Sequence, residues 1–396
     1  MSSSDSIVIV EGARTPMCEY NGSFTDLSAT ELSVAASREA LKRSGFEPSE
    51  IDHVILGNVM QTSADAIYLA RHVGLKLGVP VDRPALTVNR LCGSGFEAIV
   101  QAKHRIQLGE AKAVLAGGTE NMSQAPHVIR GARSGFRLGQ GKLEDSLMVA
   151  LLDSYTGLYM AQTSDNISRR LGITREEQDA FAVESQRRAA AAWTACRLSE
   201  EVVAVEVKKG KKTQLVERDD HLTPDSTLET LSRLSPAFGK DGMVTAGNAS
   251  GIVDGAASVI VSFEAQARTK GITPLGRLVA EAVVGCDPSE MGIGPVPATR
   301  AALAKAGLTI ADIDLFEINE AFAGQILGVS KELGLDHEKL NVNGGAIALG
   351  HPLGASGARL VLTLLKELRR RGKRWGLASA CIGGGQGLAM VVESIQ

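Results

Sequence analysis

Two stretches of this chain resemble each other closely enough to indicate an internal duplication. Residues 36–41 match residues 298–303, and the alignment continues without a gap to Asp52 and Asp314. In each copy an alanine-rich helix is predicted to end at a glycine, which suits a left-handed C-cap, and an apolar strand follows. Because the register holds through both elements, chance similarity of two amphipathic units is the weaker explanation. The duplication favours a fold built from two similar α/β halves.

The segment between the two copies differs from both of them. Residues 123–247 are more polar, and the alternation of strands and helices breaks down there. This segment holds a helix opened by a capping box from Thr174 to Glu177 and a predicted hairpin over 203–216. A long insertion in an α/β protein commonly serves as a binding lid or an oligomer contact. The sequence therefore predicts an N-terminal half over 1–122 plus 248–271, an inserted loop domain over 123–247, and a C-terminal half over 272–396.

Composition excludes several classes of function. Aromatic residues make up 4% of the chain and the net charge is −3, which argues against a nucleic-acid-binding surface. No apolar stretch is long enough to span a bilayer, and neither residues 1–5 nor residues 393–396 match a targeting signal. The five cysteines favour reduced thiols in a cytoplasmic compartment, and Cys18, Cys196 and Cys286 are interpreted as packing or surface thiols. No metal-ligand spacing is present, so we expect no metal site.

Cys92 is the first candidate for a reactive group. It lies between a predicted strand and a predicted helix that continues to Gly109, and Gly93 and Gly95 flank it. A thiol at a helix N-terminus faces unpaired amides, which predicts a lowered thiol pKa. The flanking glycines allow a ligand to approach the backbone. A buried cysteine that merely fills space is the competing interpretation.

The C-terminal half adds three further candidates. His351 lies in a glycine-rich turn and is followed by Pro352, while Asn319 and Cys381 each follow a predicted strand. Polar groups at strand ends are where α/β proteins build active sites. A Cys–His pair can generate a thiolate, and a second cysteine can transfer a proton. We therefore expect the sulfurs of Cys92 and Cys381 and the imidazole of His351 to meet in one pocket.

These motifs together resemble the signatures of the thiolase family. The resemblance rests on the stretches around Cys92, Asn319, His351 and Cys381, and on residues 245–251. It begins at residues 11–16 and covers essentially the whole chain; residues 65–75 and 285–288 are most similar to 3-ketoacyl-CoA thiolases. The resemblance implies a layered αβαβα core formed by the duplicated halves. It also implies thiolytic cleavage of 3-ketoacyl-CoA, as in fatty-acid β-oxidation, and the reverse Claisen condensation.

The resemblance assigns a role to each candidate residue. Cys92 would be the nucleophile that carries the acyl group, and His351 would activate it. His351 and a water held by Asn319 would stabilise the thioester oxygen. Cys381 would protonate the departing carbanion. The backbone amides of Cys92 and Gly383 would form a second oxyanion hole, in which one donor is worth about 3 kcal/mol.

The resemblance also implies the partners and the binding residues. Coenzyme A would be a substrate rather than a bound cofactor, the chain would form homodimers or homotetramers, and the inserted loop domain would contribute to CoA binding and oligomer contacts. Two departures from the family pattern are Thr223, where relatives often place an arginine near the adenine, and Tyr159, where acetoacetyl-CoA-specific relatives often have a histidine. The implied pantetheine contacts are Leu151, Phe238, Ala246, Ala249 and Ser250, and the implied acyl-pocket residues are Met160, Met291 and Phe322.

Three alternatives to a 3-ketoacyl-CoA thiolase stay open from the sequence. One is a short-chain acetoacetyl-CoA thiolase, an acetyl-CoA C-acetyltransferase. The second is a decarboxylating ketoacyl synthase, which pairs its cysteine with two histidines, whereas His351 is the one histidine in the matching motifs. The third is an inactive acyl-CoA-binding protein, which would have no need for all four catalytic positions. The mitochondrial matrix is an alternative location to the cytoplasm.

Overall fold

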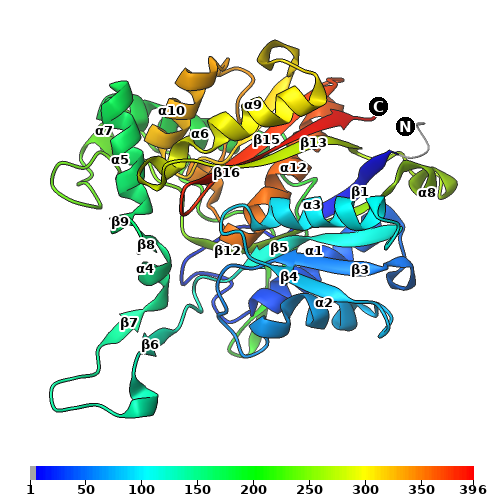
Figure 1. Cartoon of the computed structure of the whole chain (residues 1–396), viewed down its shortest axis with the longest axis horizontal. Coiled ribbons are helices and arrows are strands. Elements are labelled where there is room, and N and C mark those ends of the chain that lie inside the picture. Colours follow the sequence, from blue (N-terminus) through cyan, green and yellow to red (C-terminus); the bar gives the residue numbers. More distant parts are fainter. Residues whose placement is uncertain (1–5) are drawn as a thin grey trace.

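The computed structural model of the chain describes residues 6–396; residues 1–5, where the sequence predicts no targeting signal, lie outside the described residues. At its centre is a ten-stranded sheet in the order β14-β15-β16-β13-β1-β12-β5-β3-β4, with β2 paired to β12 (Figure 1). β1 pairs with β12 along its length but with β13 only at Val8 and Ile9, so the two halves of the sheet join at a narrow seam. The strands are β1 (Ile7–Arg14), β2 (Cys18–Glu19), β3 (His53–Gly57), β4 (Ala85–Val88), β5 (Ala113–Glu120), β12 (Val253–Phe263), β13 (Gly276–Gly285), β14 (Leu315–Ile318), β15 (Trp375–Ile382) and β16 (Gln386–Ser394).

The helices around this sheet form the layers expected from the sequence. α1 and α2 cover the outer face of the N-terminal half of the sheet, and α9 and α10 cover the outer face of the C-terminal half. α3 and α12 pack against each other between the two halves and share one large apolar core with strands of both. The result is a layered αβαβα arrangement. These helices are α1 (Ala29–Ser44), α2 (Leu69–Leu77), α3 (Ser94–Gln107), α9 (Pro295–Ala306), α10 (Ala323–Leu333) and α12 (Leu353–Arg370), with the short α8 (Glu264–Thr269) and α11 (Ala346–Leu349) beside them.

The duplication read from the sequence is present in the structure. α1 ends at Gly45 with φ 62°, and α9 ends at Gly307 with φ 69°. Both glycines adopt the left-handed conformation that suits this residue. β3 follows the first helix and β14 follows the second, each after one short 3-10 turn, η2 (Pro48–Glu50) and η6 (Ile310–Asp312). The helix–turn–strand unit predicted twice from the sequence is therefore confirmed.

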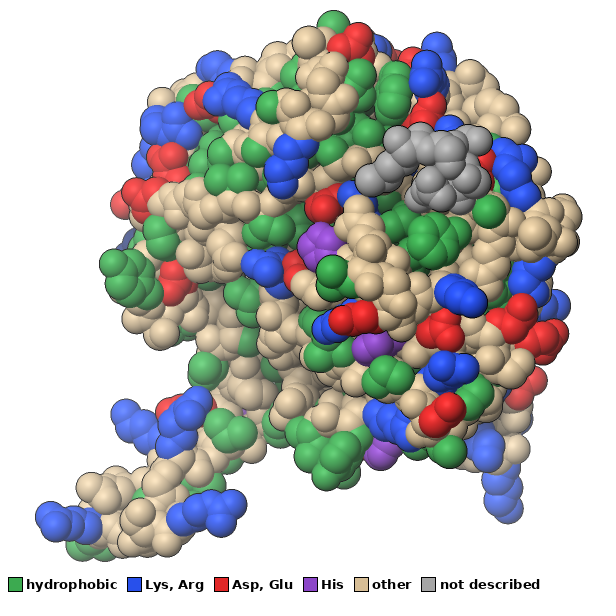
Figure 2. Space-filling view, turned by 45° about the vertical axis from the view of Figure 1, so that its right-hand side comes forward, with side chains coloured by type: hydrophobic (Ala, Val, Ile, Leu, Met, Phe, Trp, Pro, Cys, Tyr) green, Lys and Arg blue, Asp and Glu red, His purple; other side chains and the backbone are tan. Residues whose placement is uncertain are grey.

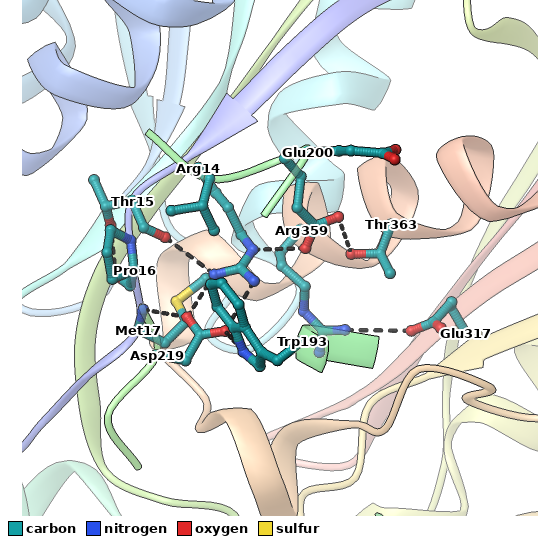
Figure 3. Close-up of polar contacts among 12 residues, drawn as sticks. Arg14, Thr15, Pro16, Met17, Trp193, Glu200, Asp219, Glu317, Arg359 and Thr363 are labelled. Atoms are coloured by element: carbon teal, nitrogen blue, oxygen red, sulfur yellow. Dashed lines mark hydrogen bonds and ion pairs between the residues drawn. The ribbon is translucent and has the colours of Figure 1, made fainter. Parts of the chain in front are cut away.

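The central helix α12 is buried over most of its length and carries charge into the core. Its Arg359 donates to a carboxylate oxygen of Glu317 at 3.2 Å. Elsewhere in the core, Arg14 contacts Asp219 at 2.6 Å (Figure 3) and also contacts Glu201 at 2.6 Å. An unpaired ion inside a protein costs several kcal/mol, so these contacts make the buried charges tolerable. The contacts of Arg14 also tie the N-terminal half to the inserted segment.

The inserted segment does not form one lid. Its predicted capping box is present, since the Thr174 side chain accepts from the backbone N–H of Glu177, and its predicted hairpin is β10–β11. α5 and α6 pack on α10 of the C-terminal half, whereas β10 and β11 pack beside α1 of the N-terminal half. The elements of this segment are α4 (Ser146–Ala150), α5 (Met160–Leu171), α6 (Arg175–Thr194), α7 (Leu228–Ser232), β6 (His127–Ile129), β7 (Leu143–Asp145), β8 (Leu152–Asp153), β9 (Leu158–Tyr159), β10 (Val205–Lys209) and β11 (Lys212–Val216).

Part of the insertion projects from the body as an arm. The arm consists of residues 127–145, with the paired strands β6 and β7 at its base (Figures 1 and 2). Phe136 and Leu138 are exposed on it, and Leu138 is fully so. Residues 130–142 contain four Lys or Arg residues and no Asp or Glu: Arg130, Arg133, Arg137 and Lys142. An arm with exposed apolar side chains and a positive tip has the character of a contact surface.

Two observations bear on membranes and metals. Over residues 6–396, none of the helices combines the length and the apolar character needed to cross a bilayer. Over the same range, no three His, Cys, Asp or Glu side chains gather closely enough to hold a metal ion. The expectation that the protein needs no metal stays a prediction.

Candidate active site

Cys92 lies in a tight turn between β4 and α3. Leu91 just before it has φ 48°, a left-handed conformation that costs a non-glycine residue about 1–3 kcal/mol. The Ser94 side chain stabilises the turn, because its hydroxyl donates to Leu91 O at 2.6 Å and accepts from Arg90 N at 2.9 Å. Gly93 is the N-cap of α3. The strained turn and the hydrogen bonds of the Ser94 hydroxyl hold the thiol at the start of α3.

His351 is held from both sides of its backbone. Gly350 before it has φ 88°, and Pro352 after it is the N-cap of α12. The backbone N–H of His351 donates to Gly251 O at 2.9 Å. Its ring Nδ1 lies 2.5 Å from the hydroxyl of Ser356, while Nε2 is buried and has no hydrogen-bond partner within residues 6–396. The imidazole therefore has one anchored nitrogen and one free nitrogen.

Asn319 and Cys381 come from neighbouring parallel strands. β14 and β15 pair in parallel, so residues near their carboxyl ends share one edge of the sheet. The backbone N–H of Asn319 donates to Ser379 O at 2.9 Å. Asn319 is fully buried, yet neither atom of its side-chain amide has a partner in the described part of the chain. Orphaned buried amide groups are rare and call for a ligand or a water.

A single cavity of about 200 Å³ brings the candidate reactive groups together. Cys92, His351 and Cys381 all line it, as expected from the sequence, although they lie far apart along the chain. Asn319, Gly383 and Ala246 are not among its lining residues. The other residues that line the cavity are Met122, Met148, Leu151, Tyr159, Met160, Ala161, Phe238, Ala249, Ser250, Gly251, Ile252, Met291, Ala321, Phe322 and Leu353.

The predicted substrate contacts are mostly found at this cavity. Seven of the eight line it: Leu151, Met160, Phe238, Ala249, Ser250, Met291 and Phe322. Ala246 lies outside the lining of this cavity, and its role in CoA binding stays a prediction. Sequence analysis missed Met122, Met148 and Leu353, because apolar residues without a motif carry no local signal of where they will lie. The rings of Tyr159 and Phe238 pack against each other with centroids 4.8 Å apart and planes tilted by 33°.

The three reactive groups are neutral in the resting site. Burial raises the pKa of the Cys92 thiol to about 11, against the effect of a hydrogen bond from the backbone N–H of Gly383. Burial also raises the pKa of Cys381 well above its ordinary value. Burial, and then the charge of Arg359, lowers the pKa of His351 to about 3. The sequence prediction of a lowered thiol pKa for Cys92 is therefore wrong, because desolvation outweighs the helix terminus.

A buried carboxylate beside the site was missed by the sequence analysis. Glu120 at the end of β5 accepts from the backbone N–H groups of Val59, Met60 and Gly354, at 3.1, 2.9 and 2.9 Å, and from the Asn58 side chain at 3.0 Å. Gly354 belongs to the first turn of α12. Burial raises the pKa of Glu120 to about 7, and its negative charge contributes to raising the pKa of Cys92. Glu120 thus links the N-terminal half to the helix that follows His351.

The fold and site together define a class of protein. Two related α/β halves that enclose two thiols and one imidazole in a mostly apolar cavity are typical of a cysteine-dependent acyltransferase. Comparison with known families agrees: residues 7–265 match the thiolase N-terminal domain, and residues 272–394 match the thiolase C-terminal domain. The chain belongs to the thiolase family, and it is an acyltransferase of that family.

Relatives of two names resemble this chain over its whole length. The human mitochondrial 3-ketoacyl-CoA thiolase is 52% identical over 389 residues, which cover 98% of each chain. An acetyl-CoA acetyltransferase of Cupriavidus necator is 47% identical over 389 residues, which cover 98% of this chain and 99% of the relative. The solved structure of the human enzyme in complex with CoA matches with a TM-score of 0.96 at 52% identity, covering 100% of this chain and 99% of that chain. The acetyl-CoA acetyltransferase of Bacillus anthracis matches with a TM-score of 0.97 at 42% identity over the full length of both chains.

Proposed function

We propose that this thiolase cleaves 3-ketoacyl-CoA with free CoA, giving acetyl-CoA and a shortened acyl-CoA, and that it also catalyses the reverse Claisen condensation. The observation that carries the proposal is the meeting of Cys92, His351 and Cys381 at one mostly apolar cavity. The proposal agrees with the name of the human relative, 3-ketoacyl-CoA thiolase, and one structure of that relative contains CoA. CoA is then a substrate, and no permanently bound cofactor takes part.

The first half of the reaction transfers the acyl group to Cys92. Nε2 of His351 removes the proton of the Cys92 thiol as the sulfur attacks the 3-keto carbon. This transfer is possible because the thiol is protonated and the imidazole is neutral before the substrate binds. The bond between C2 and C3 breaks, and its electron pair goes to the thioester enolate of acetyl-CoA. Cys381 protonates C2 and becomes a thiolate. The acyl group remains on Cys92 as a thioester, which conserves its activation.

The second half releases the acyl group. The thiol of an incoming CoA gives its proton to the Cys381 thiolate and attacks the carbonyl carbon of the acyl-enzyme. The bond to the Cys92 sulfur breaks, and His351 returns its proton to that sulfur. Every group is then back in its starting state. The two cysteines therefore have separate roles, with Cys92 as nucleophile and Cys381 as proton donor and acceptor.

Two sets of hydrogen-bond donors stabilise the substrate oxygens that become negatively charged during the reaction. Asn319 has a buried amide with no partner in the described chain, which suits a bridging water that donates, together with His351, to the enolate oxygen. The backbone N–H groups of Cys92 and Gly383 serve the oxygen of the tetrahedral intermediate. The N–H of Gly383 already reaches the Cys92 sulfur in the resting site. One such donor is worth about 3 kcal/mol of transition-state stabilisation.

The residues that line the cavity favour 3-ketoacyl substrates with acyl chains of more than one length. Four methionines line it: Met122, Met148, Met160 and Met291. Methionine side chains are flexible and adapt to ligands of different shape. Leu151, Phe238, Ala246, Ala249 and Ser250 are proposed for the pantetheine arm, and Met160, Met291 and Phe322 for the acyl chain. The relatives named acetyl-CoA acetyltransferase keep a second candidate open, a short-chain enzyme specific for acetoacetyl-CoA.

We further propose that the chain assembles as a homodimer or homotetramer. β4 ends the sheet on the N-terminal side, with β3 as its one partner in the described sheet, and all four of its residues are half-buried. An open strand edge invites pairing with another chain. The arm over 127–145, which projects from the body (Figure 1), offers a second contact, because Phe136 and Leu138 are exposed on it.

The proposed compartment is a reducing one, the cytoplasm or the mitochondrial matrix. Cys92 and Cys381 face one cavity as free thiols, and the mechanism needs both of them reduced. The human relative named above is mitochondrial by name.

The decisive experiment separates the two cysteines. Cleavage of acetoacetyl-CoA and of longer 3-ketoacyl-CoA by free CoA is followed in a coupled assay. Cys92→Ala should abolish both turnover and the acyl-enzyme that mass spectrometry detects after incubation with acetyl-CoA. Cys381→Ala should abolish turnover while still accepting some acetyl group on Cys92. Cys196→Ala, at an exposed cysteine outside the cavity, is the matched control and should behave as the wild type.

The same assay decides between the candidates. Turnover that falls to the background beyond acetoacetyl-CoA would favour the short-chain enzyme. Turnover retained by Cys92→Ala would contradict the mechanism. No turnover with any 3-ketoacyl-CoA in the wild type would leave only an acyl-CoA-binding role.

A further inference from the structure

The two ring nitrogens of His351 have different surroundings. Nδ1 lies 2.5 Å from the hydroxyl oxygen of Ser356, which is itself 1% exposed. Nε2 is buried and without a partner in residues 6–396, and His351 lines the cavity together with Cys92 and Cys381. The position of the imidazole proton therefore decides whether the cavity meets a lone pair or an N–H.

The hydroxyl of Ser356 has a second partner. It donates to the carbonyl oxygen of Pro352 at 3.0 Å, one turn earlier in α12. A hydroxyl has one hydrogen and two lone pairs, so the hydrogen used on Pro352 O is not available to the imidazole. With that hydrogen on Pro352 O, the short contact with His351 is a hydrogen bond that Nδ1–H donates to the Ser356 oxygen. This leaves Nε2 as the unprotonated nitrogen.

We propose that Ser356 is a positioning residue that holds His351 in the Nδ1–H tautomer, with the Nε2 lone pair available to take the proton of Cys92. The proposal rests on the function proposed above. The same contact suits the next state of the cycle, because an imidazolium also donates from Nδ1 and Ser356 can go on accepting. Ser356 thus orients the ring without changing its own bonds when Nε2 gains or loses the proton.

The alternative tautomer, protonated at Nε2, would have no hydrogen-bond acceptor for its N–H in the described chain. Apart from Ser356, no hydrogen-bond partner of the His351 ring lies in the described chain. The neutral form of the ring is favoured, since burial lowers the pKa of His351 to about 3, so one nitrogen carries the proton and the other does not. Removing the hydroxyl would leave a buried Nδ1–H without an acceptor, and the proton would then shift between the nitrogens or the ring would turn.

The direct test reads the tautomer in the resting enzyme without CoA. Protein labelled with nitrogen-15 in its seven histidines is studied by NMR, with the His351 signals identified by their loss in His351→Asn. The wild type should show His351 protonated at Nδ1. Ser356→Ala should show a mixed or Nε2–H form, and Ser356→Thr, which keeps a hydroxyl, should restore the Nδ1–H form. A wild type protonated at Nε2 would overturn the proposal without reference to any variant.

Kinetics give the second readout. Ser356→Ala should lower kcat of thiolysis about 10- to 100-fold, the loss seen when a partner that orients a metal-ligating imidazole is removed, with KM nearly unchanged. Ser356→Thr should recover most of that loss. Ser44→Ala removes another buried hydroxyl that donates to a helix carbonyl, Leu41 O at 2.9 Å, and is the matched control that should keep kcat.

The outcomes separate this inference from the proposed function. Ser356→Ala with unchanged tautomer and kcat would overturn the positioning role even if the protein is a thiolase. Conversely, the tautomer result is obtained without turnover, so it stands even if Cys92→Ala retains activity and the proposed reaction is wrong.

Discussion

At the scale of single residues, the site is governed by burial rather than by formal charge. Cys92 precedes a helix and was expected to be a thiolate, yet burial raises the pKa of its thiol to about 11. His351 is neutral for the same reason. A neutral thiol beside a neutral base is stable without substrate, and the proton moves only when a substrate carbonyl provides a place for the resulting charge. Such a site limits attack by stray electrophiles between turnovers.

This resting state predicts a steep pH dependence for alkylation of Cys92. Only the thiolate reacts with iodoacetamide, so with a pKa near 11 the inactivation rate should rise about tenfold per pH unit from pH 7 to 9. The rate is measured from residual thiolase activity, with Cys92→Ala used to confirm the alkylated residue by mass spectrometry. A rate that is already constant across this range would show a preformed thiolate–imidazolium pair instead.

The buried imidazole predicts a loss of stability in acid. His351 has an ordinary pKa near 6.5 when unfolded and one of about 3 when folded, so below pH 6.5 the unfolded chain binds the additional proton. The folded state should therefore lose about 1.4 kcal/mol per pH unit, or about 2 kcal/mol between pH 6.5 and 5. Urea unfolding of the wild type and of His351→Asn at pH 7 and pH 5 checks this, at one protein concentration. An equal loss in both proteins would contradict the prediction.

At the scale of elements, the site depends on how closely α3 and α12 approach. A Cβ at Gly95 of α3 would lie 2.7 Å from Ala358 N and 3.0 Å from Gly354 O of α12. A Cβ at Gly357 of α12 would lie 2.3 Å from the backbone nitrogen of Phe96. Both helices therefore need glycine at the contact. Because Cys92 precedes one helix and His351 precedes the other, the glycine contact sets the distance between thiol and imidazole.

Gly95→Ala should therefore reduce activity more than stability. Alanine is favoured over glycine within a helix by about 0.5–1 kcal/mol, which offsets part of a packing cost of about 1–3 kcal/mol. A displacement of about 1 Å between reacting groups can cost about 10²-fold in rate. The measurements are kcat for thiolysis and the free energy of unfolding in urea.

Gly285→Ala is the control for this substitution. The nearest atom to an added Cβ at Gly285 is 3.9 Å away, so both quantities should stay near the wild-type values. If Gly95→Ala lost stability in proportion to activity, the helix contact would be a general packing feature rather than a determinant of the site.

At the scale of the whole molecule, the projecting arm is the part that the fold does not explain. Residues 127–145 project from the body (Figure 2), and Phe136 and Leu138 on this arm are exposed to solvent. Exposed apolar residues on a projection contribute nothing to the stability of one chain and suit burial against another. The arm leads through α4, β8 and β9 to Tyr159 and Met160 at the cavity, so an assembly formed through the arm would also support the cavity wall.

Shortening the arm should change the assembly but not the fold. Replacing residues 130–142 by a short Gly–Ser linker removes the exposed apolar residues and the four basic ones. Light scattering after size-exclusion chromatography should then show a smaller particle, with the far-UV circular dichroism spectrum little changed. Leu138→Glu, a single substitution at a fully exposed position, should weaken the assembly in the same direction. An unchanged mass for both variants would place the subunit contact elsewhere.

The sequence by itself determined what depends on neighbouring residues. The paired helix–glycine–strand units, the capping box at Thr174 and the β10–β11 hairpin follow from local conformational preferences, and the structure confirms them. Asn319 follows β14 as predicted, whereas Cys381 is the last but one residue of β15 rather than the residue after it. The same local preferences predict that Cys92, Cys381 and His351 lie near the ends of strands and helices.

Only the tertiary structure decided how these groups behave together. The neutral state of Cys92 and His351 results from desolvation by atoms of many distant segments. A local sequence pattern cannot predict the total desolvation, because it does not specify which segments pack around the site. The same holds for Met148 and Leu353 in the cavity wall, for Ala246 outside it, and for Ser356 against the imidazole. A motif specifies which groups are present, whereas dielectric surroundings and contact distances exist only once the chain has packed.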